Sequence, residues 1–143
     1  MIDTNIWLDL YVFADGGARA LAGDLAAGRV RALRSDATDA ELRLVLARPQ
    51  FAARAGALGP DPLQAWLALA TRCEPQRAAP WLCRDPDDQK FLDLAWSAGA
   101  ALLFTKDRAL LGLARRARAA GLAILEPKNH PPGAGGAAAI GYR

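Results

Sequence analysis

Four acidic residues are spread along this chain of 143 residues: Asp3, Glu41, Asp88 and Asp107. Three of them follow a predicted strand or precede a predicted helix. In a parallel α/β sheet, such positions open onto one crevice at the carboxyl ends of the strands. Carboxylates gathered there repel one another unless cations lie between them, and hard divalent cations prefer oxygen ligands. The pattern therefore predicts a metal site with the chemistry of metal-assisted phosphodiester cleavage.

Each acid also has a purely structural interpretation. Asp3 and Asp107 stand where an N-cap would start a helix. Glu41 is placed to form a capping box with Thr38, in which it would reach back to the cap amide. Asp88 precedes apolar helix positions by three and four residues, so we expect it on the core-facing side of a helix start. A carboxylate there needs a cation or hydrogen-bond donors, which favours Asp88 over its neighbouring aspartates as a ligand.

The chain reads as alternating strands and helices. Strands are expected at residues 1–6, 30–33, 100–105 and 122–125. Helices are expected at residues 7–13, 18–27, 62–72 and 109–119, in a segment from Thr38 to before Pro49, and between Asp88 and Gly99. Gly28, Gly99 and Gly121 are predicted helix stops. This alternation predicts a mostly parallel sheet with helices on both faces.

Composition places the chain among soluble globular proteins, since 52% of its residues are hydrophobic and 23% are charged. Its length suits one domain with a real core. No apolar run is long enough to span a membrane. The first residues lack the features of a secretion signal, and the two cysteines are too few for a disulfide framework. We therefore expect a cytoplasmic protein with reduced thiols.

The formal net charge of +3 is unevenly distributed. Acidic residues concentrate near positions 85–93, whereas arginines cluster elsewhere, at positions 29, 31 and 34, 43 and 48, and 115, 116 and 118. A basic surface around an acidic crevice suits a polyanion such as RNA that must reach a bound metal. The alternative is that these arginines only solvate the outer faces of helices.

Several short motifs together resemble the PIN domain family, in particular VapC-like proteins identified as toxins of bacterial toxin–antitoxin pairs. The motifs are Asp3-Thr4-Asn5, Glu41-Leu42 followed by Val45-Leu46-Ala47-Arg48-Pro49, Arg84-Asp85-Pro86-Asp87-Asp88 followed by Lys90-Phe91-Leu92, and Ala98-Gly99-Ala100 leading into Thr105-Lys106-Asp107. The resemblance covers about residues 2–127, with the motifs in the family's order and spacing.

The resemblance implies a three-layer α/β/α sandwich with a mostly parallel, about five-stranded sheet. It also implies an endoribonuclease that depends on Mg²⁺ or Mn²⁺. Carried over by position, the catalytic and metal-binding acids are Asp3, Glu41, Asp88 and Asp107, with Asn5 and Thr105 as supporting polar groups. Asp3 and Asp88 would ligate the metal, while Asp107 and Glu41 would hold waters or orient the nucleophile. A slip of the alignment would put Asp85 or Asp87 in the place of Asp88.

The resemblance further implies a homodimer that is held inactive by a small antitoxin. Exposed Trp7, Tyr11 or Trp66 could anchor such interfaces, although core packing explains each of them as well. The alternative function is a catalytically idle PIN-like module that binds RNA or protein. Residues 1–127 would form the nuclease domain in either case, and the Gly/Ala/Pro-rich residues 128–143 would form a flexible tail.

Three departures from the family pattern bear on the site. Only two residues precede Asp3, whereas the family usually has a longer first strand, so either the native start lies upstream or the sheet centre is thin. Lys106 stands where a small residue is common, and its ammonium could pair with an acid, touch a phosphate or crowd the metal. The tail has no family counterpart, and its His130, the single histidine of the chain, is not expected to act as a general base.

Overall fold

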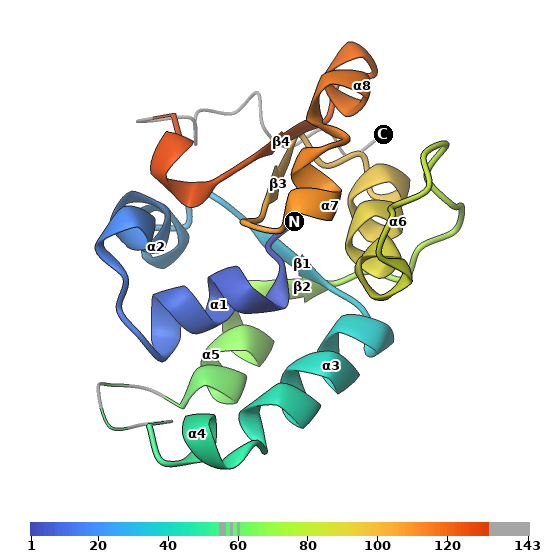
Figure 1. The fold of residues 1–143 in the computed structure, drawn as a ribbon. Coiled ribbons are helices and arrows are strands. Elements are labelled where there is room, and N and C mark those ends of the chain that lie inside the picture. The colour runs from blue at the N-terminus through green and yellow to red at the C-terminus, as the bar shows by residue number, and fades with distance from the viewer. Residues whose placement is uncertain (55–56, 58, 60, 132–143) are drawn as a thin grey trace.

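The computed structural model describes residues 1–54, 57, 59 and 61–131, and its strands are short and parallel (Figure 1). Strand β1 (Ala32–Arg34) pairs with β2 (Ala70–Arg72), and β3 (Leu102–Phe104) pairs with β4 (Ala123–Leu125). Ile2 adds one isolated parallel bridge to Phe104. The α/β class with parallel pairing is thus confirmed. The expected five-stranded sheet is not seen in the described residues, which contain two two-stranded sheets.

The missing centre of the sheet has a local cause. Residues 1–6 were expected to form a strand, but helix α1 (Thr4–Tyr11) already begins after Asp3. The Asp3 carboxylate accepts a hydrogen bond from the backbone N–H of Ile6 at 2.9 Å, and this cap starts the helix. Ahead of this cap, Ile2 makes an isolated bridge to Phe104 of β3, and residues 1–3 form no strand.

Helices account for most of the remaining structure. The α-helices after α1 are α2 (Arg19–Ala26), α3 (Asp36–Leu46), α4 (Pro49–Ala52), α5 (Pro62–Leu69), α6 (Gln89–Ser97), α7 (Arg108–Leu111) and α8 (Ala114–Ala119). Short 3-10 helices are η1 (Gly16–Ala18), η2 (Pro86–Asp88) and η3 (Pro127–Asn129). In Figure 1, α3, α4 and α5 gather at the lower end of the view, and α6, α7 and α8 lie at the right and top.

Three expected helices differ clearly in extent, and the first is the helix expected at residues 7–13, which is α1 (Thr4–Tyr11). The helix predicted at residues 62–72 ends at Leu69, because residues 70–72 pair with β1 as strand β2. Tertiary pairing there overrides local helix preference. The helix predicted at residues 109–119 is divided into α7 and α8 at Gly112 and Leu113. The stops at Gly99 and Gly121 are confirmed, since both have positive φ angles, 65° and 93°, that suit glycine after a helix.

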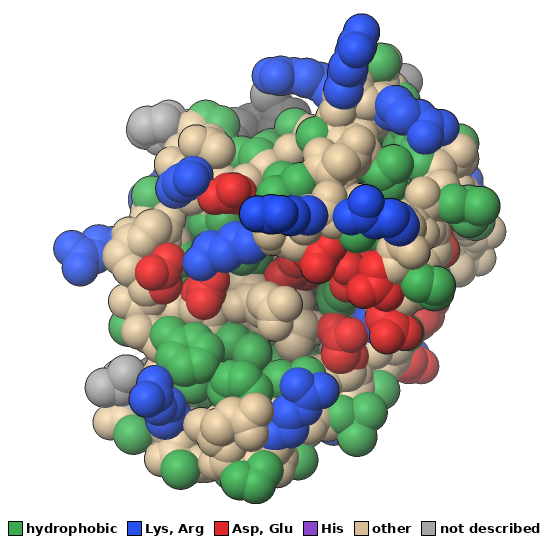
Figure 2. All heavy atoms as spheres, viewed as in Figure 1, with side chains coloured by type: hydrophobic (Ala, Val, Ile, Leu, Met, Phe, Trp, Pro, Cys, Tyr) green, Lys and Arg blue, Asp and Glu red, His purple; other side chains and the backbone are tan. Residues whose placement is uncertain are grey.

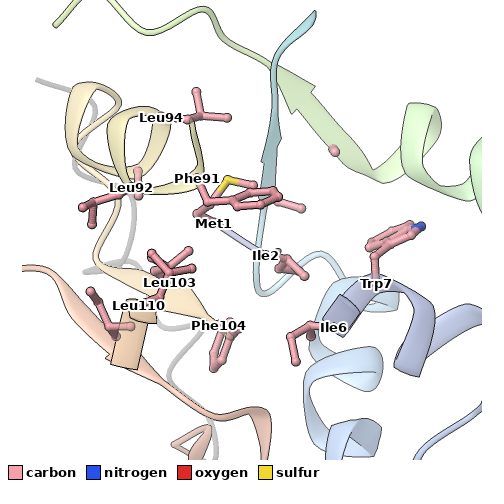
Figure 3. Packing of buried hydrophobic residues seen from close by; sticks show 14 of the residues in the cluster. Met1, Ile2, Ile6, Trp7, Phe91, Leu92, Leu94, Leu103, Phe104 and Leu110 are labelled. Atoms are coloured by element: carbon pink, nitrogen blue, oxygen red, sulfur yellow. The ribbon is translucent and has the colours of Figure 1, made fainter. Parts of the chain in front are cut away.

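The core lies between α1, α6 and strand β3 (Figure 3). Ile2, Trp7, Leu92, Leu103 and Phe104 are each at most 1% exposed. Burial of these residues fixes the start of α1, next to Asp3, and the end of β3, which is followed by Asp107. The main hydrophobic cluster therefore also positions two of the four acids.

The large aromatic residues that could have formed an interface belong to this core. Trp7 and Trp66 are 0% and 3% exposed, and their ring centroids are 4.9 Å apart. The Trp7 indole donates to the carbonyl of Pro62 at 3.0 Å, and the Trp66 indole donates to Asp39 Oδ1 at 2.6 Å. Tyr11 is half-buried beside Trp7. Core packing is therefore the role of both tryptophans.

The packed part of the chain continues past Pro127, where we expected the tail to begin. His130 is 5% exposed, and its Nε2 lies 2.5 Å from Asp24 Oδ2 on α2. Residues 132–143 of the expected tail lie outside the described residues. Cys73 and Cys83 are free thiols. Within the described ranges, every helix falls short of the length and apolar character that crossing a membrane requires.

Candidate active site

Asp3 is the most buried acid of the site and lies between Ile2, which bridges to β3, and the first turn of α1. It is 4% exposed, and both carboxylate oxygens accept hydrogen bonds: Oδ1 from the N–H of Ile6 and Oδ2 from the hydroxyl of Thr105. The pKa of Asp3 is raised to about 6, chiefly by burial; its two hydrogen bonds lower the pKa, and the charges of Asp107 and Glu41 raise it. Thr105 links Asp3 to the backbone of Asp107, and Thr4, the residue after Asp3, donates to Glu41.

Asp107 and Thr105 come from the loop after β3. Thr105 is fully buried, and its Oγ1 accepts from the backbone N–H of Asp107 at 2.9 Å. Asp107 Oδ1 accepts from the N–H of Ala109 at 2.7 Å and thereby caps α7. The expected N-cap role of Asp107 is confirmed. Thr105 thus joins the Asp3 carboxylate to the backbone that carries Asp107.

Asp88 is the last residue of η2 and immediately precedes α6. Its Oδ2 atom is buried and has no hydrogen-bond partner. The pKa of Asp88 is raised to about 7, chiefly by burial and next by the negative charges of Asp107, Asp85 and Asp3. Asp85 and Asp87 are exposed, and Asp85 instead accepts from the N–H of Asp87 at 3.0 Å. The structure therefore brings Asp88 beside Asp107, whereas Asp85 caps η2.

Glu41 lies in the middle of α3, so its expected capping box with Thr38 is wrong. The capping box is formed by Ser35 and Thr38 at the start of that helix. Glu41 Oε2 instead accepts from the hydroxyl of Thr4, and Oε1 lies 2.8 Å from the Lys90 ammonium. Helical geometry explains the error, since a residue five positions inside α3 projects sideways from the helix, here toward the start of α1.

Thr4 and Lys90 are site residues that the sequence reasoning did not single out. Thr4 belongs to the Asp-Thr-Asn motif, and Lys90 follows Asp88 by two positions, so both lay within the motifs already recognised. Asn5, which we expected to support the acids, is exposed on the first turn of α1. Lys106 pairs with acids of α1 and the following loop, at 2.7 Å from Asp9 Oδ2 and 3.6 Å from Asp15 Oδ2.

Charge is segregated on the face that carries these residues. Figure 2 shows acidic side chains gathered on one face, with lysine and arginine side chains along their border. Among the four acids of the site, Asp3 and Asp88 have strongly raised carboxyl pKa values. Perturbed carboxyl groups that are gathered in one place are typical of functional sites.

The donor set suits a hard divalent cation in kind, because it consists of carboxylate and hydroxyl oxygens. The buried, unpartnered Oδ2 of Asp88 is a group that a cation would satisfy. With the side chains as they stand, however, no three His, Cys, Asp or Glu residues in the described part of the chain are arranged to hold a metal ion. Both oxygens of Asp3 are engaged in hydrogen bonds. Asp88 is therefore the acid of this group that keeps a buried oxygen without a protein partner.

Comparison with protein families agrees with this arrangement. The PIN domain family model matches residues 1–109, and the chain belongs to that family. PIN domains are generally nucleases, which supports a nuclease role for this chain. No curated protein and no solved structure gives a significant match.

Proposed function

We propose that this chain is an endoribonuclease that depends on Mg²⁺ or Mn²⁺. The observation that carries the proposal is the Asp88 carboxylate, whose Oδ2 is buried without a partner beside the acidic Asp107 and Asp3. A buried carboxylate oxygen without a partner is costly unless a cation or a proton compensates it. Membership of the PIN family supports the nuclease class.

The residues of the site would have distinct duties. Asp88, Asp107 and Asp3 would hold the metal, with Glu41 at the border of the site. When bound, the cation would supply positive charge to the phosphate and acidify a water that attacks it. Thr105 fixes the Asp3 carboxylate through its hydroxyl, and Thr4 does the same for Glu41. These hydroxyls keep the acids in place while substrate enters.

A pair of neighbouring substitutions tests the proposal. Asp88→Asn removes the charge of the unpartnered carboxylate, whereas Asp87→Asn removes an equal charge from an exposed neighbour. Cleavage of end-labelled single-stranded RNA in Mn²⁺ should fall at least about 100-fold in Asp88→Asn, since ligand and transition-state charge are lost together. Asp87→Asn should stay within about threefold of the unchanged chain.

Two further outcomes decide the matter. Chelation with EDTA should abolish cleavage by the unchanged chain, and added Mn²⁺ should restore it. Asp3→Asn should also abolish cleavage while the fold is retained, as circular dichroism would show. Full activity of Asp88→Asn, or activity that persists in EDTA, would contradict the metal-dependent mechanism.

A second candidate is a catalytically idle PIN-like module that binds RNA or protein. It is favoured by the absence, in the described residues, of a ready-made metal-holding group and by the ion pair between Glu41 and Lys90. The two candidates differ in response to metal. A nuclease should gain thermal stability with Mn²⁺, by about 2.7 kcal/mol at 100 times its dissociation constant, whereas an idle module should gain none.

The biological role that we propose is that of the toxin in a type II toxin–antitoxin pair, acting as a homodimer in the cytoplasm. The support is the resemblance of the four motifs to VapC-like proteins. Induced expression of the chain should then arrest bacterial growth, and expression of Asp88→Asn should not. A short reading frame next to the gene, whose product relieves the arrest, would identify the antitoxin. Light scattering on the purified chain would test the dimer.

A further inference from the structure

The Lys90 ammonium lies against Glu41, one of the four acids. Its Nζ is 2.8 Å from Glu41 Oε1 and donates to the backbone carbonyl of Asp87 at 2.7 Å. The same ammonium lies 5.3 Å from the centre of the Phe91 ring. The side chains of Lys90 and Glu41 are each 25% exposed. Three contacts therefore hold this cation in one place, unlike a surface lysine.

The position of Lys90 conflicts with binding of a metal at Glu41. A cation ligated by Oε1 of Glu41 would have to take the place of the ammonium, and Oε2 is already occupied by the hydroxyl of Thr4. Displaced from Glu41, Lys90 would keep its charge close to the incoming ion and repel it. No comparable cation lies against Asp88 in the described part of the chain, where Oδ2 has no partner.

We propose that Lys90 takes the place of a second divalent cation, so that the site binds a single metal ion on the Asp88, Asp107 and Asp3 side. Glu41 is then a positioning residue that holds Lys90 and Thr4, and it does not ligate the metal. This inference rests on the proposed metal-dependent function. It specifies the number of metal ions and assigns Lys90 the fixed positive charge beside Glu41.

Mn²⁺ binding tests the inference without any measurement of activity. Calorimetric titration of the full chain, with free Mn²⁺ followed in parallel by electron paramagnetic resonance, should give one Mn²⁺ per chain. Lys90→Met frees the Glu41 carboxylate and should raise the count to two. Lys90→Arg keeps the charge and should leave the count at one. Circular dichroism melting curves would show that each variant is folded.

Lys106→Met is the matched control. Lys106 is also a lysine of this region, but it pairs with Asp9 and Asp15 and is 47% exposed. Its removal lowers the local positive charge equally and should leave one Mn²⁺ per chain. Glu41→Gln should also keep one Mn²⁺, whereas Asp88→Asn should weaken binding about tenfold or more.

The outcomes separate this inference from the proposed function. Two Mn²⁺ in the unchanged chain, or a single Mn²⁺ in folded Lys90→Met, would overturn the role of Lys90 and leave a metal-dependent nuclease in place. A gain of a second ion in Lys106→Met as well would show that charge, and not the position of Lys90, sets the count, and would also overturn it. No Mn²⁺ binding by the unchanged chain would overturn the proposed function itself, and this inference with it.

Discussion

At the scale of single residues, ionisation of the Asp88 carboxylate lowers the stability of the folded chain. Its pKa is about 7 in the folded chain, against an ordinary value of 3.8. The folded state therefore prefers the protonated acid, so ionisation of Asp88 opposes folding. This cost is absent below the ordinary pKa, grows as the pH rises from about 4 to about 7, and then stays constant. Asp3, with a pKa of about 6, contributes in the same direction.

Substitution of Asp88 should reveal that cost in metal-free protein. Asn resembles the protonated acid, so Asp88→Asn should raise the free energy of unfolding at pH 8 by roughly 1–2 kcal/mol, a value reduced for the partial exposure of the side chain. At pH 4 the variant and the unchanged chain should be equally stable. Urea unfolding in EDTA at both values of pH provides the measurement. An equal effect at pH 4 and pH 8 would mean that charge is not the cause.

At the scale of elements, helix α3 carries Glu41 and depends on its capping box. The Ser35 side chain accepts from the backbone N–H of Thr38, and the Thr38 hydroxyl accepts from the N–H of Ser35 at 2.8 Å. Both residues are buried, at 2% and 1% exposure. Asp39, one turn on, pairs with Arg34 at 2.6 Å and so ties the helix to β1.

Removal of the cap should weaken the whole domain. Ser35→Ala leaves helix N–H groups without partners in a buried place, so the free energy of unfolding should fall by about 1 kcal/mol, within a range of roughly 0.5–2. Ala37→Ser, on the exposed side of the same turn, should change it by less than about 0.5 kcal/mol. Chemical denaturation measures both. A Ser35→Ala variant as stable as the unchanged chain would show that the cap contributes nothing.

At the scale of the whole molecule, His130 fastens the segment after β4 to α2 and the core. Its Nε2 contacts Asp24 Oδ2, and its ring lies edge-on to Phe104 with centroids 5.3 Å apart. Hydrogen bonds from His130 and Arg29 lower the pKa of Asp24. Phe104 is also the residue that Ile2 bridges, so this contact supports the strand next to the site.

His130→Ala should therefore lower the melting temperature by roughly 5–10 °C, because a buried ring and the partner of Asp24 are both lost. Asn129→Ala, at the exposed neighbouring position, should leave the melting temperature nearly unchanged. Differential scanning calorimetry of the two variants makes the comparison. Equal melting temperatures would place His130 outside the cooperative unit, in agreement with a domain that ends at Pro127.

Several features of the fold, and the protein family, could be predicted from local sequence patterns. Apolar residues at helical spacing locate α6, and the glycines at 99 and 121 end helices because their φ angles are positive. Asp3 and Asp107 cap helices, which was the structural alternative to metal binding at both positions. Motif order also led to the PIN family, whose model matches residues 1–109. These features depend on neighbours in sequence, so the sequence alone determines them.

Other features depend on partners that are distant in sequence. Residues 70–72 form a strand only because β1 lies beside them, and the sheet centre is a single bridge because α1 begins at Thr4. The Lys90 ammonium meets Glu41 across two helices that lie far apart in the chain. Burial of Asp88 Oδ2, which raises its pKa, is likewise a property of the packed molecule. The sequence by itself determined which acids are present and the helix stops at Gly99 and Gly121. Only the tertiary structure decided that Asp88 is the acid with a buried oxygen that has no partner. The reason is that desolvation and long-range pairing exist only once the chain has folded.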